Sequence, residues 1–395
     1  MSKKLNFDIL ESLRGVAALY VCIGHCRGNL WIGGEHYLRL HPRNTLGFFD
    51  YLVLGSNMLT RLTTEFVIVF FVLSGFSIAH SLRNTTKPWP FYKRRFIRLY
   101  PPYVAAIFWA MLVVLLIQLI YPHFVDGTYQ TPTFGRLEAS RQLFNWKTFL
   151  KNLIYLPQTD GVLRPFWSLT QEVIFYILAP FLFRNRRIYY TISIILYLAV
   201  TALLQMGWIR DTIITEYFYF NIFFVVGVAL YNNFELICDK LAIFTTRKSL
   251  WTAIAIFFIM IFISLSIKNY ELVTAFISAF MSIILIMYLL SQNVQVKPLI
   301  AIGRFSYTLY ITHFATVMLF MTLYYLIARA SPPYIYNNIV FIPAIFFCLG
   351  IAWLHYTLVE KRSKAILGKL RIKDAVNQVQ PGAGSDKQVI TILRD

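Results

Sequence analysis

Charged residues and cysteines are scarce in this sequence of 395 residues. Only 14% of the residues are charged, whereas 58% are hydrophobic, which excludes an ordinary soluble domain and indicates a polytopic helical membrane protein. The sequence also has no internal repeat and no second soluble domain. Its cysteines imply no disulfide framework, because all of them lie in or near apolar segments: Cys22, Cys26, Cys238 and Cys348.

Acidic residues are few as well, with 18 Asp and Glu against 37 Lys and Arg and a formal net charge of +19. Such an excess of positive charge is typical of proteins that bind nucleic acid, but the cytoplasmic loops of membrane proteins are rich in Lys and Arg in any case. We therefore interpret the charge as topological and expect a lipid bilayer, not nucleic acid, as the partner. The first apolar stretch is interrupted by charge and lacks a small-residue cleavage site, so we expect a retained helix, not a signal peptide.

The apolar windows predict an all-α, polytopic membrane protein with about ten transmembrane helices. They lie near residues 9–30, 65–82, 99–121, 166–183, 188–208, 217–231, 250–267, 272–291, 300–327 and 339–359.

An even number of spans places both termini on one side of the membrane. If that side is the cytoplasm, Lys and Arg favour the cytoplasmic segments by roughly two to one, as the positive-inside rule requires. We therefore expect a multi-pass protein of a bacterial-type inner membrane, with a ten-helix domain over residues 1–360. Residues 361–395 are expected to form a cytoplasmic tail, first basic and then disordered.

Two predicted external loops, 31–64 and 122–165, are long and rich in aromatic and polar residues. The first contains GFFDYLVLGSNML, which is too short to span a membrane and is typical of a re-entrant or interfacial segment. Loops of this length often cover a site or hold a substrate.

The first span carries two ionisable side chains, Arg14 and His25. An ionisable group at membrane depth costs several kcal/mol unless it is paired or hydrated, so it indicates function by default. His25 follows Arg14 by eleven positions, which places the two on nearly the same helix face and about 16 Å apart along the axis.

Counting the helical rise sorts the other ionisable residues into two layers. Glu11, Arg14 and His80 are predicted to lie near the cytoplasmic face, and His25, Glu172 and His313 in the external part of the membrane.

Two more arginines, Arg95 and Arg98, lie in a basic segment before Pro101, which can start a helix. Three residues apart, they share a face and could form a fork for phosphate, or they could simply contact anionic lipid headgroups.

Each of these residues also has a purely structural interpretation. His25 could be a histidine that is hydrogen-bonded across helices, and Glu172 its salt-bridge partner without chemistry. Cys22, His25 and Cys26 share a helix face with a spacing similar to that of metal ligands. Three ligands on one turn would crowd a tetrahedral site, and no fourth ligand is evident, so we expect no metal.

The chain resembles the acyltransferase family 3 of integral membrane acyltransferases over about residues 8–360. The resemblance rests on a set of motifs in a fixed order: LRGVAALYVCIGHC with Arg14 and His25, FFVLSGFSIAHSL, RRFIRLYPPY with Arg95 and Arg98, WSLTQEVIFY with Glu172, GRFSYTLYITH with His313, and TLVEK with Glu360.

The resemblance implies about ten transmembrane helices and transfer of an acyl group, commonly acetyl, from cytoplasmic acetyl-CoA to hydroxyls of extracytoplasmic glycans. Lipopolysaccharide O-antigen, another surface glycan or a glycolipid would suit as the saccharide acceptor. The family's Arg-x10-His and Arg-x-x-Arg residues are implied to be essential. Some members carry a fused hydrolase-like domain, in place of which this chain has only a short tail.

The residues suggest a division of roles within that activity. Arg14, Arg95 and Arg98 are expected to bind the phosphates of CoA, whose pantetheine arm is about as long as the distance from Arg14 to His25. His25 is expected to act as the general base or as a transient acyl carrier, with Glu172 fixing its tautomer.

Weaker candidates for the site are Glu11, and His313 or Ser306 for polarising the thioester carbonyl. The alternative is a secondary transporter or glycan exporter, although such proteins tend to show repeats and broken helices near the midplane. The sequence predicts no oligomeric state.

Overall fold

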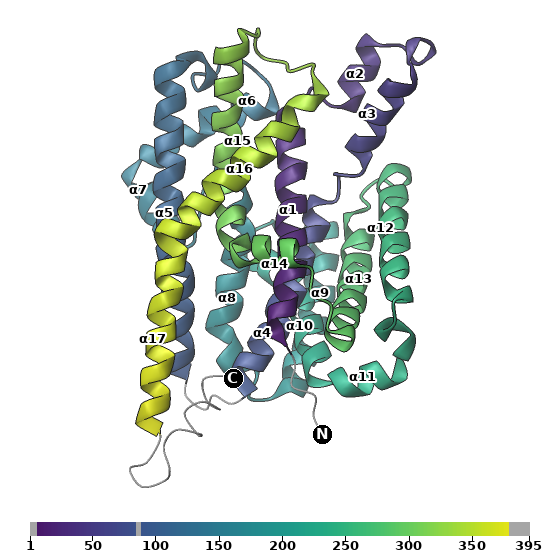
Figure 1. Cartoon of the computed structure of the whole chain (residues 1–395), viewed down its shortest axis with the longest axis vertical. Helices are drawn as coiled ribbons and strands as arrows, with labels where there is room; N and C mark the ends of the chain where they lie inside the picture. Colours follow the sequence, from purple (N-terminus) through teal and green to yellow (C-terminus); the bar gives the residue numbers. More distant parts are fainter. Residues whose placement is uncertain (1–5, 84–87, 379–395) are drawn as a thin grey trace.

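The computed structural model describes residues 6–83 and 88–378, with side chains to residue 370, and these residues form helices and no strands. Long helices run side by side (Figure 1), which confirms the all-α fold class. They are α1 (Leu10–Asn29), α4 (Thr63–Arg83), α5 (Pro88–Ile120), α8 (Trp167–Leu182), α9 (Arg186–Gln205), α10 (Ile213–Asn232), α12 (Lys248–Ser266), α13 (Glu271–Gln292), α15 (Ser306–Ala328), α16 (Phe341–His355) and α17 (Lys361–Gln378). The short ones are α2 (Gly34–Leu40), α3 (Phe48–Met58), α6 (Pro132–Ala139), α7 (Trp146–Leu153), α11 (Phe234–Lys240) and α14 (Lys297–Arg304).

Within the described residues, eight helical stretches are long and apolar enough to cross a membrane. Each of the ten predicted windows contains a helix, but α1 and α8 are not among the eight. α1 carries Glu11, Arg14 and Arg27, and α8 has only 16 residues. Both lie alongside the spanning helices (Figure 1), so the polytopic architecture is confirmed.

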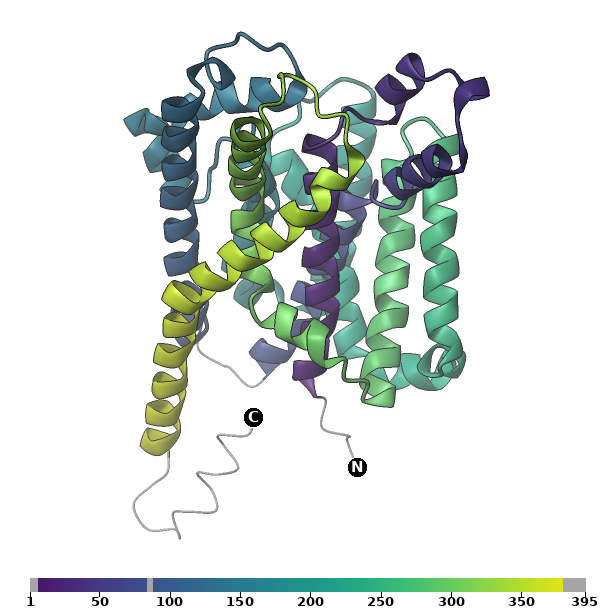
Figure 2. The same ribbon diagram turned by 45° about the horizontal axis from the view of Figure 1, so that its top comes forward.

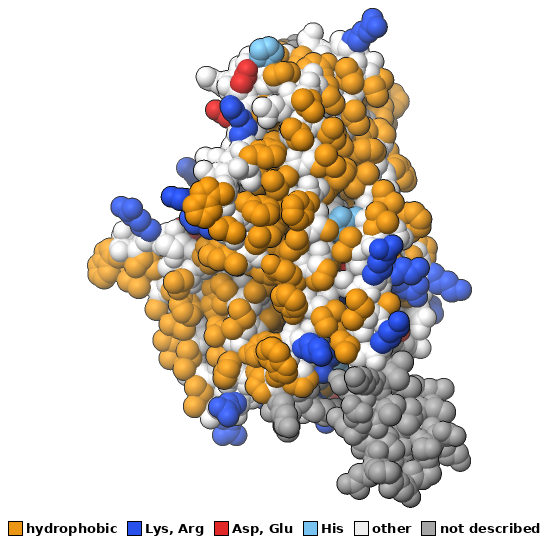
Figure 3. Space-filling view, turned by 90° about the vertical axis from the view of Figure 1, so that its left-hand side faces the viewer, with side chains coloured by type: hydrophobic (Ala, Val, Ile, Leu, Met, Phe, Trp, Pro, Cys, Tyr) orange, Lys and Arg blue, Asp and Glu red, His pale blue; other side chains and the backbone are white. Residues whose placement is uncertain are grey.

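The outer surface of the bundle is apolar, as a lipid-facing surface should be. On α5, exposed Phe108, Leu112, Leu115 and Leu119 recur at helical spacing along one side. Figure 3 shows one face of the molecule on which hydrophobic side chains cover most of the surface.

We call the end of the bundle where α1 and α5 begin the basal end, and the opposite end the apical end. α4 runs from the apical to the basal end and contacts α1, α10 and α13. Gly75 of α4 and Gly227 of α10 allow a close crossing, because a Cβ atom at either would lie 2.0–2.1 Å from a carbonyl oxygen of the other helix. Short helices lie toward the apical end, α2 and α3 on one side and α6 and α7 on the other (Figure 2).

Two predicted boundaries differ in the structure. The window 300–327 is two helices, since α14 ends at Arg304 and lies across α1 before α15 starts at Ser306 (Figure 1). A Cβ on Gly303 would lie 1.9 Å from the Glu11 carbonyl oxygen, so glycine permits this crossing. The basic segment before Pro101 is helical and not a loop, because α5 already begins at Pro88, a residue that suits a helix start.

The last helix also passes the predicted domain boundary at residue 360. A π-helical turn, Tyr356–Glu360, joins α16 to α17, and α17 packs against α5. Residues 361–378 of the predicted tail are therefore helical, and the remainder of the tail, 379–395, lies outside the described residues.

Candidate active site

His25 and His313 lie side by side between α1 and α15. His25 Nδ1 is 2.8 Å from His313 Nε2, and the two ring planes differ by 4°. His313 is fully buried, whereas His25 is only partly buried. The structure therefore joins two residues of the predicted external layer, with His25 as the more accessible one.

The second hydrogen bond of His313 fixes the tautomers of the pair. Its Nδ1 lies 3.0 Å from the Leu309 carbonyl oxygen, which can only accept, so Nδ1 carries a hydrogen. In neutral His313, Nε2 is then an acceptor, and the hydrogen between the two rings belongs to His25 Nδ1. His25 Nε2 is left with a lone pair, which is the form that a general base requires.

The apical helix α6 lies over the end of α1 that carries His25. Asn29 donates to the His25 carbonyl oxygen at 2.8 Å, and its own side-chain oxygen accepts from Thr133 and Arg136 at 3.2 Å each. Arg136 and Arg164 are close enough to act on His25 through space. The loop 122–165 thus brings two positive charges toward the histidine pair.

A second cluster of charged residues lies on the basal side. Arg14 donates to Glu11 Oε1 and to the Ser77 hydroxyl, at 2.9 Å each. The Arg95 guanidinium lies over the ring of Tyr176, 5.4 Å from its centroid, in a cation–π contact. Arg14, Arg98 and Glu172 all act electrostatically on Arg95. The structure therefore places these residues near one another, while the shared role of Arg14, Arg95 and Arg98 in binding phosphate stays a prediction.

The predicted partnership of Glu172 with His25 is wrong. Glu172 Oε1 accepts hydrogen bonds from Ser74, at 2.9 Å, and from Tyr176. Ser74 and Ser77 lie one turn apart on α4, so Glu172 is close to the level of Arg14, about 12 Å below His25 by helical rise. Glu172 therefore belongs to the basal cluster. The His313 ring occupies the position beside His25 that we expected Glu172 to fill.

Sequence reasoning missed Ser74, Ser77 and Tyr176. A signal was present, because the two serines are three residues apart in the apolar middle of α4, and Tyr176 follows Glu172 by one helical turn. Burying a small hydroxyl residue in a membrane helix costs little free energy, so serine does not mark a functional site as a buried charge does. Here, however, each serine is hydrogen-bonded to a charged side chain.

Two other predicted residues have structural partners. The Ser306 hydroxyl donates to the Gly303 carbonyl oxygen at 2.7 Å, at the turn between α14 and α15. Glu360 is buried, accepts from Thr308, and pairs with Lys364 at 2.8 Å. Glu360 thus fastens the start of α17 to α15.

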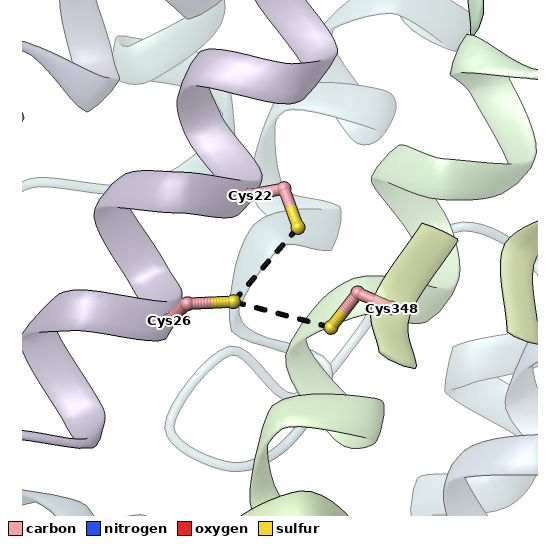
Figure 4. A group of neighbouring side chains, drawn as sticks. All are labelled: Cys22, Cys26 and Cys348. Atoms are coloured by element: carbon pink, nitrogen blue, oxygen red, sulfur yellow. Dashed lines mark hydrogen bonds between the residues drawn. The ribbon is translucent and has the colours of Figure 1, made fainter. Parts of the chain in front are cut away.

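One group among the described residues is compact enough to hold a metal ion. The sulfur atoms of Cys22, Cys26 and Cys348 lie within 4.8 Å of one another and point together from α1 and α16 (Figure 4). All three are buried, with 4.0 Å between neighbouring sulfurs. Three thiolates with no fourth ligand do not make the tetrahedral site that zinc prefers, so the absence of a metal stays a prediction.

Comparisons with known proteins identify a family for this chain. The family model described as an acyltransferase domain matches residues 7–357. A curated relative, "Protein 2 in picA locus" from Rhizobium radiobacter, is 29% identical over 183 residues, which cover 43% of this chain and 78% of the relative. No solved structure matches. The match encompasses the histidine pair and the basal cluster, and it favours an enzyme over a transporter: the chain belongs to acyltransferase family 3 and is a multi-pass membrane acyltransferase.

Proposed function

We propose that this enzyme transfers an acyl group, most simply acetyl, from cytoplasmic acetyl-CoA to a hydroxyl of a surface or periplasmic saccharide, such as lipopolysaccharide O-antigen. The basal end faces the cytoplasm of a bacterial-type inner membrane, and both termini lie on that side. This orientation follows the Lys and Arg bias along the sequence.

The basal arginines bind the donor. CoA carries phosphate groups, and Arg14, Arg95 and Arg98 supply guanidinium groups that suit phosphate oxygens. Ser77 and Glu11 orient Arg14, while the ring of Tyr176 contacts the Arg95 guanidinium. The distance of about 16 Å from Arg14 to His25 then matches the reach of an extended pantetheine arm.

His25 is the general base of the transfer. Its Nε2 takes the proton of the acceptor hydroxyl as the hydroxyl oxygen attacks the thioester carbonyl carbon. The new C–O bond forms, the C–S bond breaks, and the proton passes from His25 to the departing sulfur to give CoA thiol. Arg136 and Arg164 contribute positive charge near the oxyanion that develops during attack.

The hydrogen-bond geometry of the histidine pair is the observation that carries this proposal. Leu309 O accepts from His313 Nδ1, and His313 Nε2 in turn accepts from His25 Nδ1, so Nε2 of His25 is free to act as the base before substrate arrives. The test uses vesicles with acetyl-CoA sealed on the basal side and surface glycan from a gene-deletion strain outside. We expect His25→Ala to lose transfer by about 10²-fold or more. If that variant still acylates the glycan, His25 is not the base.

The donor site has a separate test. We expect the double variant Arg95→Ala/Arg98→Ala to weaken CoA binding, because two phosphate-binding groups are removed. Lys93→Ala is the matched control, since Lys93 is an exposed cation on the same helix. Unchanged CoA affinity in the double variant would return these arginines to the lipid-headgroup interpretation.

A further inference from the structure

An open cavity of about 440 Å³ lies at the apical end, between the starts of α8 and α10 and the apical ends of α4 and α9. Its volume falls in the range of small-molecule sites. Neither the histidine pair nor the basal arginines line it, so it is a separate feature of the molecule.

One wall of the cavity is aromatic. Trp167 of α8 and Phe220 of α10 lie 4.9 Å apart between ring centroids, and Tyr219 meets Phe220 edge-on at 4.9 Å. Phe71 of α4 packs behind both Trp167 and Phe220. The rings therefore hold one another in place and offer a preformed apolar surface, which the C–H face of a sugar ring can cover.

The lining also contains four charged side chains, most of them negative. Asp160, Asp211 and Glu216 contribute three carboxylates, and Arg164 is the cationic side chain of the lining. Gln171, which is fully buried, donates to Glu216 Oε2 at 2.9 Å and fixes that carboxylate. Carboxylates accept hydrogen bonds from hydroxyl and ammonium groups, whereas a ligand carboxylate or phosphate would meet repulsion.

A short connection leads from this cavity to the histidine pair. Arg164 begins a turn of 3₁₀ helix, Arg164–Phe166, whose Pro165 carbonyl oxygen accepts from Tyr310 at 3.1 Å. The ring of Tyr310 lies 5.8 Å from that of His313. Arg164 itself lines the cavity and acts on His25 through space. A saccharide held against the aromatic wall would therefore be separated from the histidine pair by Pro165 and Tyr310.

We propose that this cavity binds the acceptor saccharide and selects a neutral or amino-bearing sugar over an acidic one. The inference rests on the proposed transfer to a saccharide and adds the charge class of the acceptor. The aromatic wall positions the sugar ring, the carboxylates bind its hydroxyl or ammonium groups, and the net negative lining excludes uronic acids, sialic acids and phosphorylated sugars.

The experiment complements a gene-deletion strain with variants of the full chain and identifies the acylated residue of its surface glycans by mass spectrometry. The variants are Glu216→Gln, Asp211→Asn and Trp167→Leu. Glu35→Gln is the matched control, because Glu35 is an exposed carboxylate of α2, also on the apical side but outside the cavity. Protein abundance in membranes and CoA affinity are measured for every variant, so that a folding failure is recognised.

The inference is supported if the ester lies on a neutral or amino sugar and its amount falls at least tenfold in the cavity variants. The amount of ester in the control variant and the CoA affinity of every variant should be unchanged. An ester on an acidic sugar would overturn the charge selection and leave the transferase function intact. Cavity variants as active as Glu35→Gln would remove the cavity from acceptor binding. If deletion of the gene removes no ester from any glycan, the proposed function itself fails.

Discussion

At the scale of single residues, the candidate active site uses a backbone carbonyl where a carboxylate was expected. In a Ser-His-Asp triad a buried acid orients the base and stabilises its charged form. Here Leu309 O orients His313, and His313 orients His25, so this hydrogen-bonded chain contains no carboxylate. A chain without a carboxylate buries no negative charge, which is less costly at membrane depth.

This arrangement makes His313 a positioning residue with a specific requirement. We expect His313→Leu to lower kcat by about 10²-fold with an unchanged KM for acetyl-CoA, because His25 then loses the acceptor that fixes its tautomer. His313→Gln should recover much of the activity, since its amide oxygen can accept the same hydrogen. Steady-state kinetics on both variants provide the measurement, with exposed His123→Ala as the control. Equal losses in the Leu and Gln variants would contradict a role in setting the tautomer.

Glu172 should affect the donor and not the proton transfer. In Glu172→Gln the carboxylate that accepts from Ser74 and Tyr176 loses its charge, and Tyr176 supports Arg95. We expect KM for acetyl-CoA to rise several-fold, while the pH profile of kcat keeps its shape. If the pH profile shifts and the KM does not, Glu172 acts on His25 after all, as first predicted from the sequence.

At the scale of elements, α14 crosses α1 closely beside Arg14. It crosses α1 at Gly15 and Gly303, where a Cβ on Gly303 would meet the Glu11 carbonyl oxygen at 1.9 Å. We expect Gly303→Ala to lower stability by about 1–3 kcal/mol, because the two helices must separate. The midpoint of thermal unfolding in detergent is the measurement. Gly350→Ala is the control, since Gly350 lies in α16 with open space around it, and a similar loss there would show that the crossing is not the cause.

The elements also show how far sequence reasoning could reach. It placed Arg14 and His25 correctly on one helix, because helical rise within a single element needs no tertiary information. It misplaced Glu172, because its depth was counted from the start of α8 as if that start lay at the membrane surface. Ser74, which binds Glu172, lies about 16 Å below the start of α4, whereas Glu172 lies only about 7 Å below the start of α8, so α8 begins below the start of α4. Only contacts between helices reveal such an offset.

The partner of His25 could not be chosen from the sequence for a related reason. His313 and Glu172 both counted as external, and a carboxylate beside a histidine is the commoner arrangement for a base. The partner of His25 depends on the break between α14 and α15, because this break sets which residues of α15 face α1. That break lies beside the Gly303 crossing, a feature that apolar windows do not record.

At the scale of the whole molecule, the proposed function requires that the two ends face different compartments. The arginines proposed to bind the donor and the histidine pair lie at different depths, and the cavity proposed for the acceptor lies toward the apical end. The proposed transfer across the membrane therefore requires a basal end in the cytoplasm. This orientation can be tested without any substrate, because the test needs to show only on which side of the membrane each end of the bundle lies.

We expect the cysteine of an Arg39→Cys variant, in α2, to react with a membrane-impermeant maleimide in intact spheroplasts. The cysteine of a Lys240→Cys variant, in α11, should react only after permeabilisation. Both side chains are exposed, at opposite ends of the bundle (Figure 1). Cys238→Ser supplies the background, because the other cysteines, Cys22, Cys26 and Cys348, are buried. The reverse labelling pattern would place the arginines of the basal cluster outside the cell, where no acetyl-CoA is available, and would rule out cytoplasmic acetyl-CoA as the donor.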